Sequence, residues 1–125
     1  QEELSITADR LHLKNVIATL VSNAVKHAFR ENAPGNEVRI SACTENGRAK
    51  ITVADNGMGI SKEHLKHIFE KYYRVPQGNL QKARGYGLGL FYAKRVVERH
   101  GGTISARSRI GKGTEFIIEL PQDDE

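Results

Sequence analysis

The sequence lacks the features that would place it among disulfide-stabilised, secreted or membrane-spanning proteins. Its single cysteine, Cys43, excludes an internal disulfide, so the core and any bound ligand must stabilise the fold. No apolar run approaches the ~18 residues that span a bilayer, and we expect no direct membrane contact. The chain has no signal-type leader and its only methionine is Met58, so we interpret it as a fragment of a longer protein.

The charge balance also narrows the classes of partner. The formal net charge is +4, but the basic residues are spread along the chain instead of being gathered in a tract with aromatic neighbours. We therefore expect no nucleic-acid partner. A moderately positive surface suits an anionic small ligand or an acidic protein surface. A length of 125 residues predicts one domain, spanning residues 1–125.

Hydrophobic patterning predicts a mixed α/β chain. A helix is expected from Asp9, as N-cap, through a stripe that ends near Ala28, and an antiparallel hairpin is expected around Asn46-Gly47. The remaining predictions are a strand over 4–7, a short helix from Ser61 to about Phe69, a long loop over 70–85, a helix over 88–100, and a hairpin of strands 103–108 and 114–120.

The first candidate site is a polar seam on the first predicted helix. Helical spacing places Asn23, Lys26, His27 and Arg30 along one line. Such a seam is often only a solvated helix flank. Alternatively, Asn23 supplies an oxygen to Mg²⁺ while Lys26 faces phosphates, because Mg²⁺ prefers oxygen ligands and is commonly shared with substrate phosphates.

The second candidate is Asp55, which ends the row of core-facing residues on its predicted strand. Asp55-Asn56-Gly57 can be no more than a turn where the strand meets water. However, Gly57 and Gly59 follow the acid at two and four residues, where backbone can approach a flat ligand closely. In that interpretation the carboxylate accepts a hydrogen bond from the amino group of an adenine.

The third candidate is the glycine-rich run Gly85-Tyr86-Gly87-Leu88-Gly89-Leu90 at the start of a predicted helix. Its backbone amides would lie at the positive end of a helix dipole, which favours phosphate, although flexibility or close packing would also explain the glycines. The run is neither a Rossmann fingerprint nor a Walker-type loop.

Taken in order, these motifs closely resemble the catalytic domain of sensor histidine kinases, within the group that includes gyrase, heat-shock chaperone and MutL ATPases. The resemblance spans nearly the whole chain. Residues 20–27 resemble the asparagine box, 55–59 the first glycine box, 68–74 the phenylalanine box, 85–90 the second glycine box, and 111–116 the closing glycine-threonine turn.

The resemblance implies a two-layer α/β sandwich of the Bergerat type. In that fold a mixed, mostly antiparallel sheet of about five strands is covered on one face by three helices, with a long lid loop. The resemblance also implies ATP and Mg²⁺ as cofactors. The implied contacts are Asn23 with Mg²⁺; Lys26 and His27 near the phosphates; Arg74 near the terminal phosphate; Asp55, Gly57, Gly59, Ile60 and Thr114 at the adenine; Gly85, Tyr86, Gly87, Leu88 and Gly89 around the triphosphate; and Tyr73, whose role as a packing aromatic is at least as plausible.

The chain departs from the family at position 19. Thr19 stands where related kinases often have asparagine and related ATPases have a glutamate that activates water. This argues against vigorous hydrolysis and for phosphoryl transfer. None of the five histidines, at positions 12, 27, 64, 67 and 100, has the context of a phosphoacceptor, so the acceptor must lie upstream.

The implied partners are therefore an acceptor-histidine dimerisation domain of the same protein and the receiver domain of a response regulator. The parent is expected to be a homodimer anchored in the bacterial inner membrane, with this domain in the cytoplasm. Three alternatives remain open: an ATPase of the gyrase or chaperone type, an inactive nucleotide-binding docking module, and a related kinase that acts on serine.

Overall fold

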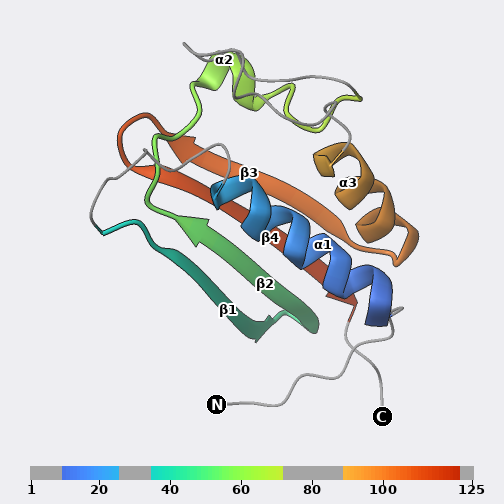
Figure 1. Cartoon of the computed structure of the whole chain (residues 1–125). Helices are drawn as coiled ribbons and strands as arrows, with labels where there is room; N and C mark the ends of the chain where they lie inside the picture. Colours follow the sequence, from blue (N-terminus) through green and yellow to red (C-terminus); the bar gives the residue numbers. More distant parts are fainter. Residues whose placement is uncertain (1–9, 26–34, 72–88, 122–125) are drawn as a thin grey trace.

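The computed structural model describes residues 10–25, 35–71 and 89–121, which form two layers (Figure 1). Helices α1 (Arg10–Asn23) and α3 (Gly89–Arg99) lie over one face of an antiparallel sheet; the resemblance implied three helices, and the third, α2 (Lys62–Leu65), has only four residues. The elements in chain order are α1 (Arg10–Asn23), β1 (Val38–Glu45), β2 (Arg48–Asp55), α2 (Lys62–Leu65), α3 (Gly89–Arg99), β3 (Thr103–Arg109) and β4 (Gly113–Pro121). No helix of these described segments is long and apolar enough to cross a membrane.

The described sheet has four strands in the order β1-β2-β4-β3, and every neighbouring pair is antiparallel. In the central pair, Val53 of β2 lies opposite Phe116 of β4, and Asp55 lies opposite Thr114. The expected count of about five strands is close to this, since the predicted strand over 4–7 lies outside the described residues. Most of the predicted lid over 70–85 lies outside them too.

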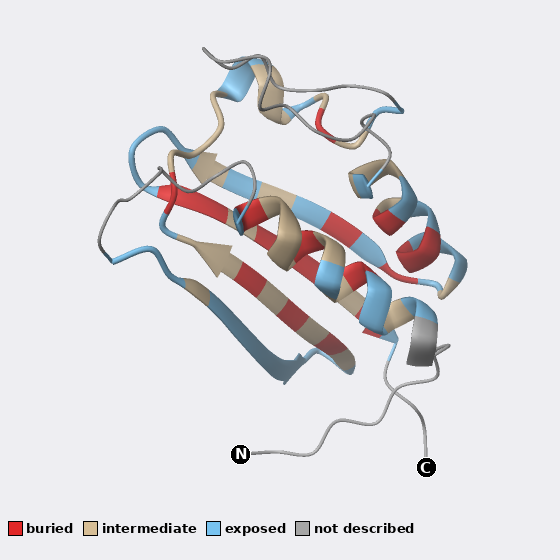
Figure 2. Cartoon of the chain, viewed as in Figure 1, coloured by how far each residue is buried: buried red, intermediate tan, exposed pale blue. Residues whose placement is uncertain are grey.

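The core lies between the sheet and the two longer helices. Along β2, side chains that face the helices are buried and alternate with less buried ones, which is the pattern of a strand covered on one face (Figure 2). Nearly all of β1 is exposed, as expected of an edge strand that the helices do not cover. The core cluster comprises Val16, Leu20, Ile51, Val53, Ile68, Ala93, Val96, Val97, Ile104, Phe116, Ile118 and Leu120.

The predicted hairpin between β1 and β2 is confirmed. Asn46 and Gly47 have φ angles of 55° and 76°, and two consecutive positive φ values are what a two-residue turn of type I′ requires. The turn sets the register, which places Ile40 opposite Val53 and Ala42 opposite Ile51. The later hairpin of β3 and β4 also forms where the pattern placed it.

The helix predicted from Ser61 to about Phe69 is much shorter than expected. Residues 62–65 are α-helical and turns follow. Ser61 does occupy the N-cap position, but its hydroxyl makes no capping hydrogen bond; its carbonyl accepts from His64 and Leu65 instead. Ile68 is the one buried side chain of this segment, so little packing stabilises a longer helix.

Candidate functional site

Asp55, the acid predicted to contact an adenine base, is brought beside Thr114 by the pairing of the two central strands. Asp55 is the last residue of β2 and lies in register with Thr114, near the start of β4. The C-terminal end of α1, which carries Asn23, lies at this same end of the two layers (Figure 1). The strands therefore join residues that are 59 positions apart in the sequence.

Backbone donors fix one oxygen of the Asp55 carboxylate. Oδ1 accepts hydrogen bonds from the N–H of Gly57 at 2.9 Å and of Thr114 at 3.3 Å. Within the described segments, no hydrogen bond engages the second oxygen, Oδ2. The carboxylate is thus oriented by its own chain and keeps acceptor capacity for a ligand.

Ser108 links the glycine loop after Asp55 to Thr114. Its Oγ accepts a hydrogen bond from the N–H of Ile60 at 2.7 Å, lies 2.8 Å from the carbonyl of Gly113, and lies 2.8 Å from Thr114 Oγ1. Among the described residues Thr114 is the one buried polar side chain, with 4% of the residue exposed. A buried hydroxyl of this kind must find a partner, and Ser108 is that partner.

Gly59 is required by the fold itself. It has a φ of +82°, and a Cβ there would clash with the Arg109 carbonyl in the β3–β4 turn. The same two segments are joined by a hydrogen bond from the Gly111 N–H to the Met58 carbonyl at 2.7 Å. We predicted that this glycine lets the backbone approach a ligand; in the structure, the atoms that a Cβ would meet belong to the protein's own backbone.

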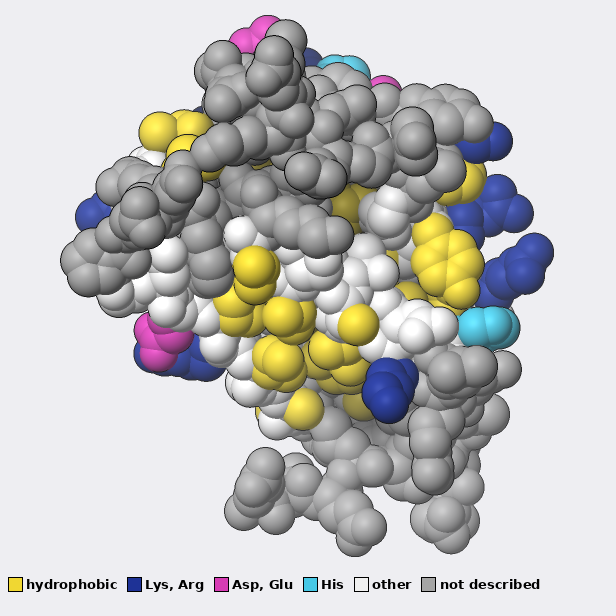
Figure 3. All heavy atoms as spheres, viewed as in Figure 1, with side chains coloured by type: hydrophobic (Ala, Val, Ile, Leu, Met, Phe, Trp, Pro, Cys, Tyr) yellow, Lys and Arg dark blue, Asp and Glu magenta, His cyan; other side chains and the backbone are white. Residues whose placement is uncertain are grey.

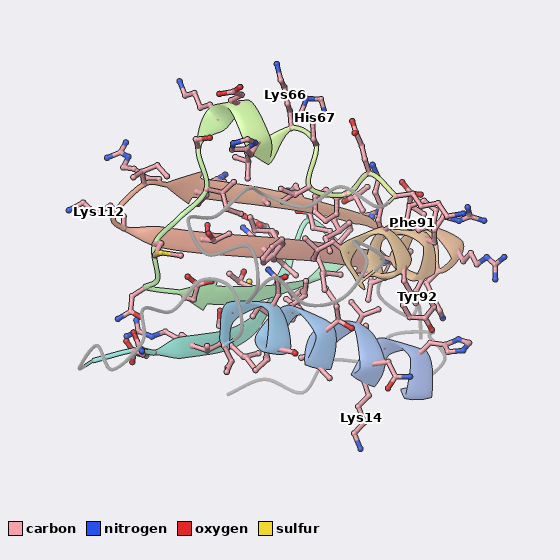
Figure 4. All side chains as sticks on the ribbon, turned by 45° about the horizontal axis from the view of Figure 1, so that its top comes forward. Lys14, Lys66, His67, Phe91, Tyr92 and Lys112 are labelled. Carbon is pink, nitrogen blue, oxygen red and sulfur yellow. The ribbon has the colours of Figure 1, made fainter. Side chains whose placement is uncertain are left out.

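Asn56 ties the same loop to the segment that precedes β1. Its Oδ1 accepts from the Glu37 N–H at 2.8 Å, and its Nδ2 donates to the Gly35 carbonyl at 2.7 Å. The described residues before β1, from Gly35 to Glu37, are thereby held against the end of β2. Lys112, by contrast, points away from the sheet at the tip of the β3–β4 turn and takes no part in this network (Figure 4).

Thr19, the residue at the expected position of a water-activating carboxylate, lies beneath the beginning of α3. A Cβ at Gly89, which is the first residue of α3, would lie 3.3 Å from Thr19 Cγ2. The packing of α1 against α3 therefore brings position 19 next to Gly89, a residue of the second glycine box. The side chain there is a hydroxyl and a methyl, with no carboxylate.

Aromatic and cationic side chains gather where the phenylalanine box meets α3. The ring of Phe69 packs edge-on against the core ring of Phe116, with centroids 6.2 Å apart. The ammonium of Lys94 lies 5.7 Å from the Phe69 centroid, while Lys71 and Arg95 lie at the same distance from that of Phe91. Lys and Arg side chains flank α3 on this side of the molecule (Figure 3). The box thus anchors the residues before position 72 to the sheet.

The phosphate end of the predicted site falls largely outside the described residues. Asp55, Gly57, Gly59, Ile60 and Thr114 are brought together, and Asn23 is half-buried at the end of α1. Within the described ranges, no group of three or more His, Cys, Asp or Glu side chains could hold a metal ion. The predicted residues that lie outside the description are Lys26, His27, Tyr73, Arg74, Gly85, Tyr86, Gly87 and Leu88.

Neither Ser108 nor Asn56 was predicted from the sequence as a site residue. The signal for Ser108 was the same as for Asp55, because Ile104, Ala106 and Ser108 form one alternating row and the polar residue ends it. Asn56 had no comparable signal, since its partners are backbone groups near position 36 whose location depends on the fold.

Comparison with known proteins places these features in a family. The family described as histidine kinase-, DNA gyrase B-, and HSP90-like ATPase matches residues 8–124. The sensor protein RprX of Bacteroides fragilis is 47% identical over 116 residues, which are 93% of this chain and 22% of RprX. The chain thus spans less than a quarter of that relative's length.

Solved structures give the same family and fold. The nucleotide-free catalytic domain of histidine kinase ThkA superposes with a TM-score of 0.78 at 29% identity, covering 98% of this chain and 75% of that one. Full-length ShkA in complex with AMPPNP superposes with a TM-score of 0.80 at 30% identity, covering 98% of this chain and 24% of that one. The chain belongs to the histidine kinase-, DNA gyrase B- and HSP90-like ATPase family, as an ATP-binding catalytic domain of the sensor histidine kinase type.

Proposed function

We propose that this domain binds Mg-ATP and donates the γ-phosphate to a histidine on a separate dimerisation domain of the same protein, from which it passes to an aspartate of a response regulator. The observation that carries the proposal is the Asp55–Ser108–Thr114 network, at the end of the sheet where α1 also ends. It offers oriented acceptors to the amino group of an adenine.

In this proposal Asp55 and Thr114 bind the adenine, and Gly57, Gly59 and Ile60 form the loop beside it. Asp55 Oδ1 is already engaged by two backbone N–H groups, so Oδ2 receives the hydrogen of the 6-amino group. Because the carboxylate is held before the ligand arrives, little freedom is lost on binding. A carboxylate also accepts stronger hydrogen bonds than a neutral oxygen does.

The phosphate end is assigned to the asparagine box, the lid and the second glycine box. Asn23 ligates Mg²⁺, Lys26 and His27 face the phosphates, and Arg74 contacts the terminal phosphate. The amides of residues 85–89 surround the triphosphate at the start of α3, where the helix dipole favours anions. Bound Mg²⁺ neutralises charge on the phosphate oxygens.

In the transfer step, a ring nitrogen of the acceptor histidine bonds to the γ-phosphorus as the bond to the β,γ-bridging oxygen breaks. ADP is the leaving group, and a ring proton of the histidine passes to solvent. This chemistry needs positioning and charge neutralisation more than a base. Thr19, beside Gly89, offers no carboxylate for activating water, which favours transfer over hydrolysis.

The parent protein is proposed to be a homodimer held in the inner membrane, with this domain in the cytoplasm. A positively charged surface beside α3 suits contact with an acidic face of the acceptor or receiver domain. An ATPase of the gyrase or chaperone type would instead release phosphate steadily, and an inactive module would bind nucleotide and transfer nothing.

Labelling separates these functions. The chain is incubated with ATP labelled at the γ-phosphate, alone and with the acceptor domain of its own protein. We expect acid-labile label on the acceptor and none on the chain alone; replacing the acceptor histidine with glutamine should abolish it. Steady release of phosphate without label would support the ATPase, and nucleotide binding with neither would support the docking module.

Nucleotide titration tests the base end directly. In Asp55→Asn, the amide oxygen can still accept from Gly57 and Thr114, which turns the amide NH₂ toward the base, where an acceptor is needed. We expect ATP affinity to fall roughly tenfold or more, because that factor corresponds to the loss of one hydrogen bond to a charged group. The matched control is Glu115→Gln, which makes the same change of charge on the residue that follows Thr114 in β4. Equal affinity in Asp55→Asn and the native chain would contradict the adenine assignment.

A further inference from the structure

The hydroxyl of Ser108 has all of its hydrogen-bonding capacity in use. A serine hydroxyl has one hydrogen to donate and two lone pairs. The Gly113 carbonyl, 2.8 Å away, can only accept, so it must receive the serine hydrogen. The Ile60 N–H can only donate, and at 2.7 Å it takes one lone pair.

This leaves one arrangement for the contact with Thr114. The two hydroxyl oxygens are 2.8 Å apart, so a hydrogen must lie between them. Because the only hydrogen of Ser108 is directed to Gly113, the hydrogen in this contact belongs to Thr114. The Thr114 hydroxyl therefore donates to Ser108 and has only lone pairs left to offer.

Thr114 and Asp55 are joined directly, since the Thr114 N–H donates to Asp55 Oδ1. We call these two residues the base-binding wall. With its hydroxyl hydrogen directed into the protein, Thr114 offers acceptors alone, as does the carboxylate. In the absence of Ser108, the Thr114 hydroxyl would be able to rotate and donate outward. The polarity of this wall is thus set by a residue on the neighbouring strand β3.

We propose that Ser108 is a positioning residue for nucleotide specificity: by accepting the Thr114 hydroxyl hydrogen it keeps the base-binding wall free of donors, which favours purines with a 6-amino group over those with a 6-oxo group. Adenine presents donor hydrogens at position 6, whereas a 6-oxo purine presents an oxygen that would face other oxygens. A site whose polar groups are left unpaired by an analogue rejects that analogue. This inference rests on the proposed binding of ATP.

A purely structural role for Ser108 makes a different prediction. If Ser108 only held Ile60 in place, its removal would loosen the loop and lower the affinity for every nucleotide by the same factor. If it sets the polarity of the wall, its removal must change the ratio of affinities for two nucleotides that differ at position 6. ATP and inosine triphosphate differ in this way, with the accompanying change at ring nitrogen 1.

The test compares dissociation constants of ATP and inosine triphosphate, with Mg²⁺, for the native chain and its variants. In Ser108→Ala, we expect the preference for ATP to fall by roughly fivefold, because that factor corresponds to the net contribution of one ordinary hydrogen bond. Ser108→Thr retains a hydroxyl and should retain the preference. Ser105→Ala is the matched control, because Ser105 lies on the same strand but is exposed on its other face.

Thr114→Val provides a second route should Ser108→Ala fail to fold, which a thermal melt without nucleotide would reveal. Valine has a similar shape and removes the acceptor itself, so the preference for ATP should fall here as well. An unchanged ratio in Ser108→Ala, or in Thr114→Val where the first variant is unfolded, would overturn the inference. So would a native chain that binds both nucleotides equally. A native chain that binds neither would refute the proposed function instead.

Discussion

At the scale of single residues, Gly59 and Gly47 separate two reasons for a glycine. Both have positive φ angles, +82° and +76°, which cost an ordinary side chain about 1 to 2 kcal/mol. They differ in their surroundings. A Cβ at Gly59 would clash with the Arg109 carbonyl, whereas a Cβ at Gly47 has no atom within 4 Å.

We predict that Gly47→Ala lowers the free energy of unfolding by about 1 to 2 kcal/mol, through backbone strain alone. Gly59→Ala should cost about 3 kcal/mol or more, because the loop after Asp55 must also withdraw from the β3–β4 turn. Urea unfolding followed by far-UV circular dichroism measures both, since the chain has no tryptophan to report on folding. Equal losses in the two variants would show that the loop and the turn can separate freely.

At the scale of elements, the loop after β2 is fastened on two sides, to the β3–β4 turn and to the segment before β1. The second attachment is the side chain of Asn56, which reaches Glu37 and Gly35. Both bonds are exposed to solvent, so each contributes less than a buried bond would. They act on an element boundary, however, and fix where the chain enters the sheet.

We predict that Asn56→Ala lowers the free energy of unfolding by about 1 kcal/mol, from two solvent-exposed hydrogen bonds. Hydrogen exchange should also quicken at the Glu37 amide, which donates to Asn56. Arg39→Ala is the matched control nearby, because the side chain of Arg39 makes an exposed ion pair with Glu37, and such pairs contribute little. The same exchange rate at Glu37 in both variants would contradict the proposed attachment.

Elements with strong local signals could be predicted from the sequence. The β1–β2 hairpin follows from alternation around a dipeptide that tolerates two positive φ values, and α3 was predicted to within one residue at its C-terminal end. The helix after Ser61 was overestimated because propensity and a serine at the N-cap position do not suffice without a capping bond and a buried face.

The site could be predicted only where it coincides with a motif. Asp55 ends a buried row and lies within a glycine pattern, so its location could be inferred. The hydrogen-bond network around Ser108 could not, because Ile60, Gly113 and Thr114 meet only when β3, β4 and the loop are in place. Parity along β3 is enough to place Ser108 on the inward face, but not to identify the groups that it meets.

At the scale of the whole molecule, the two ends of the nucleotide are assigned to different parts of the chain. The proposed base end lies where β2 ends and β4 begins, and Ser108 of β3 pairs with Thr114 there. The phosphate end is assigned to Asn23, at the end of α1, and to segments around α3. A ligand that reaches both ends should therefore stabilise the fold more than one that reaches the base end alone.

Nucleotide should raise the melting temperature, since a ligand that binds only the folded state stabilises it by mass action. At about 100 times the dissociation constant this is about 2.7 kcal/mol, or roughly 10 °C for a chain of this size. We predict that a chelator of Mg²⁺ markedly reduces the shift caused by a fixed concentration of ATP, because in the proposed site the metal joins Asn23 to the phosphates. The smaller shift caused by adenosine, which has no phosphates, should not depend on Mg²⁺ and serves as the control. In Asn23→Ala, the shift with ATP should lose its dependence on Mg²⁺ while that with adenosine persists. Identical shifts for ATP with and without chelator would remove the metal from the Asn23 end of the site and leave Asp55 and Thr114 as the basis for nucleotide binding.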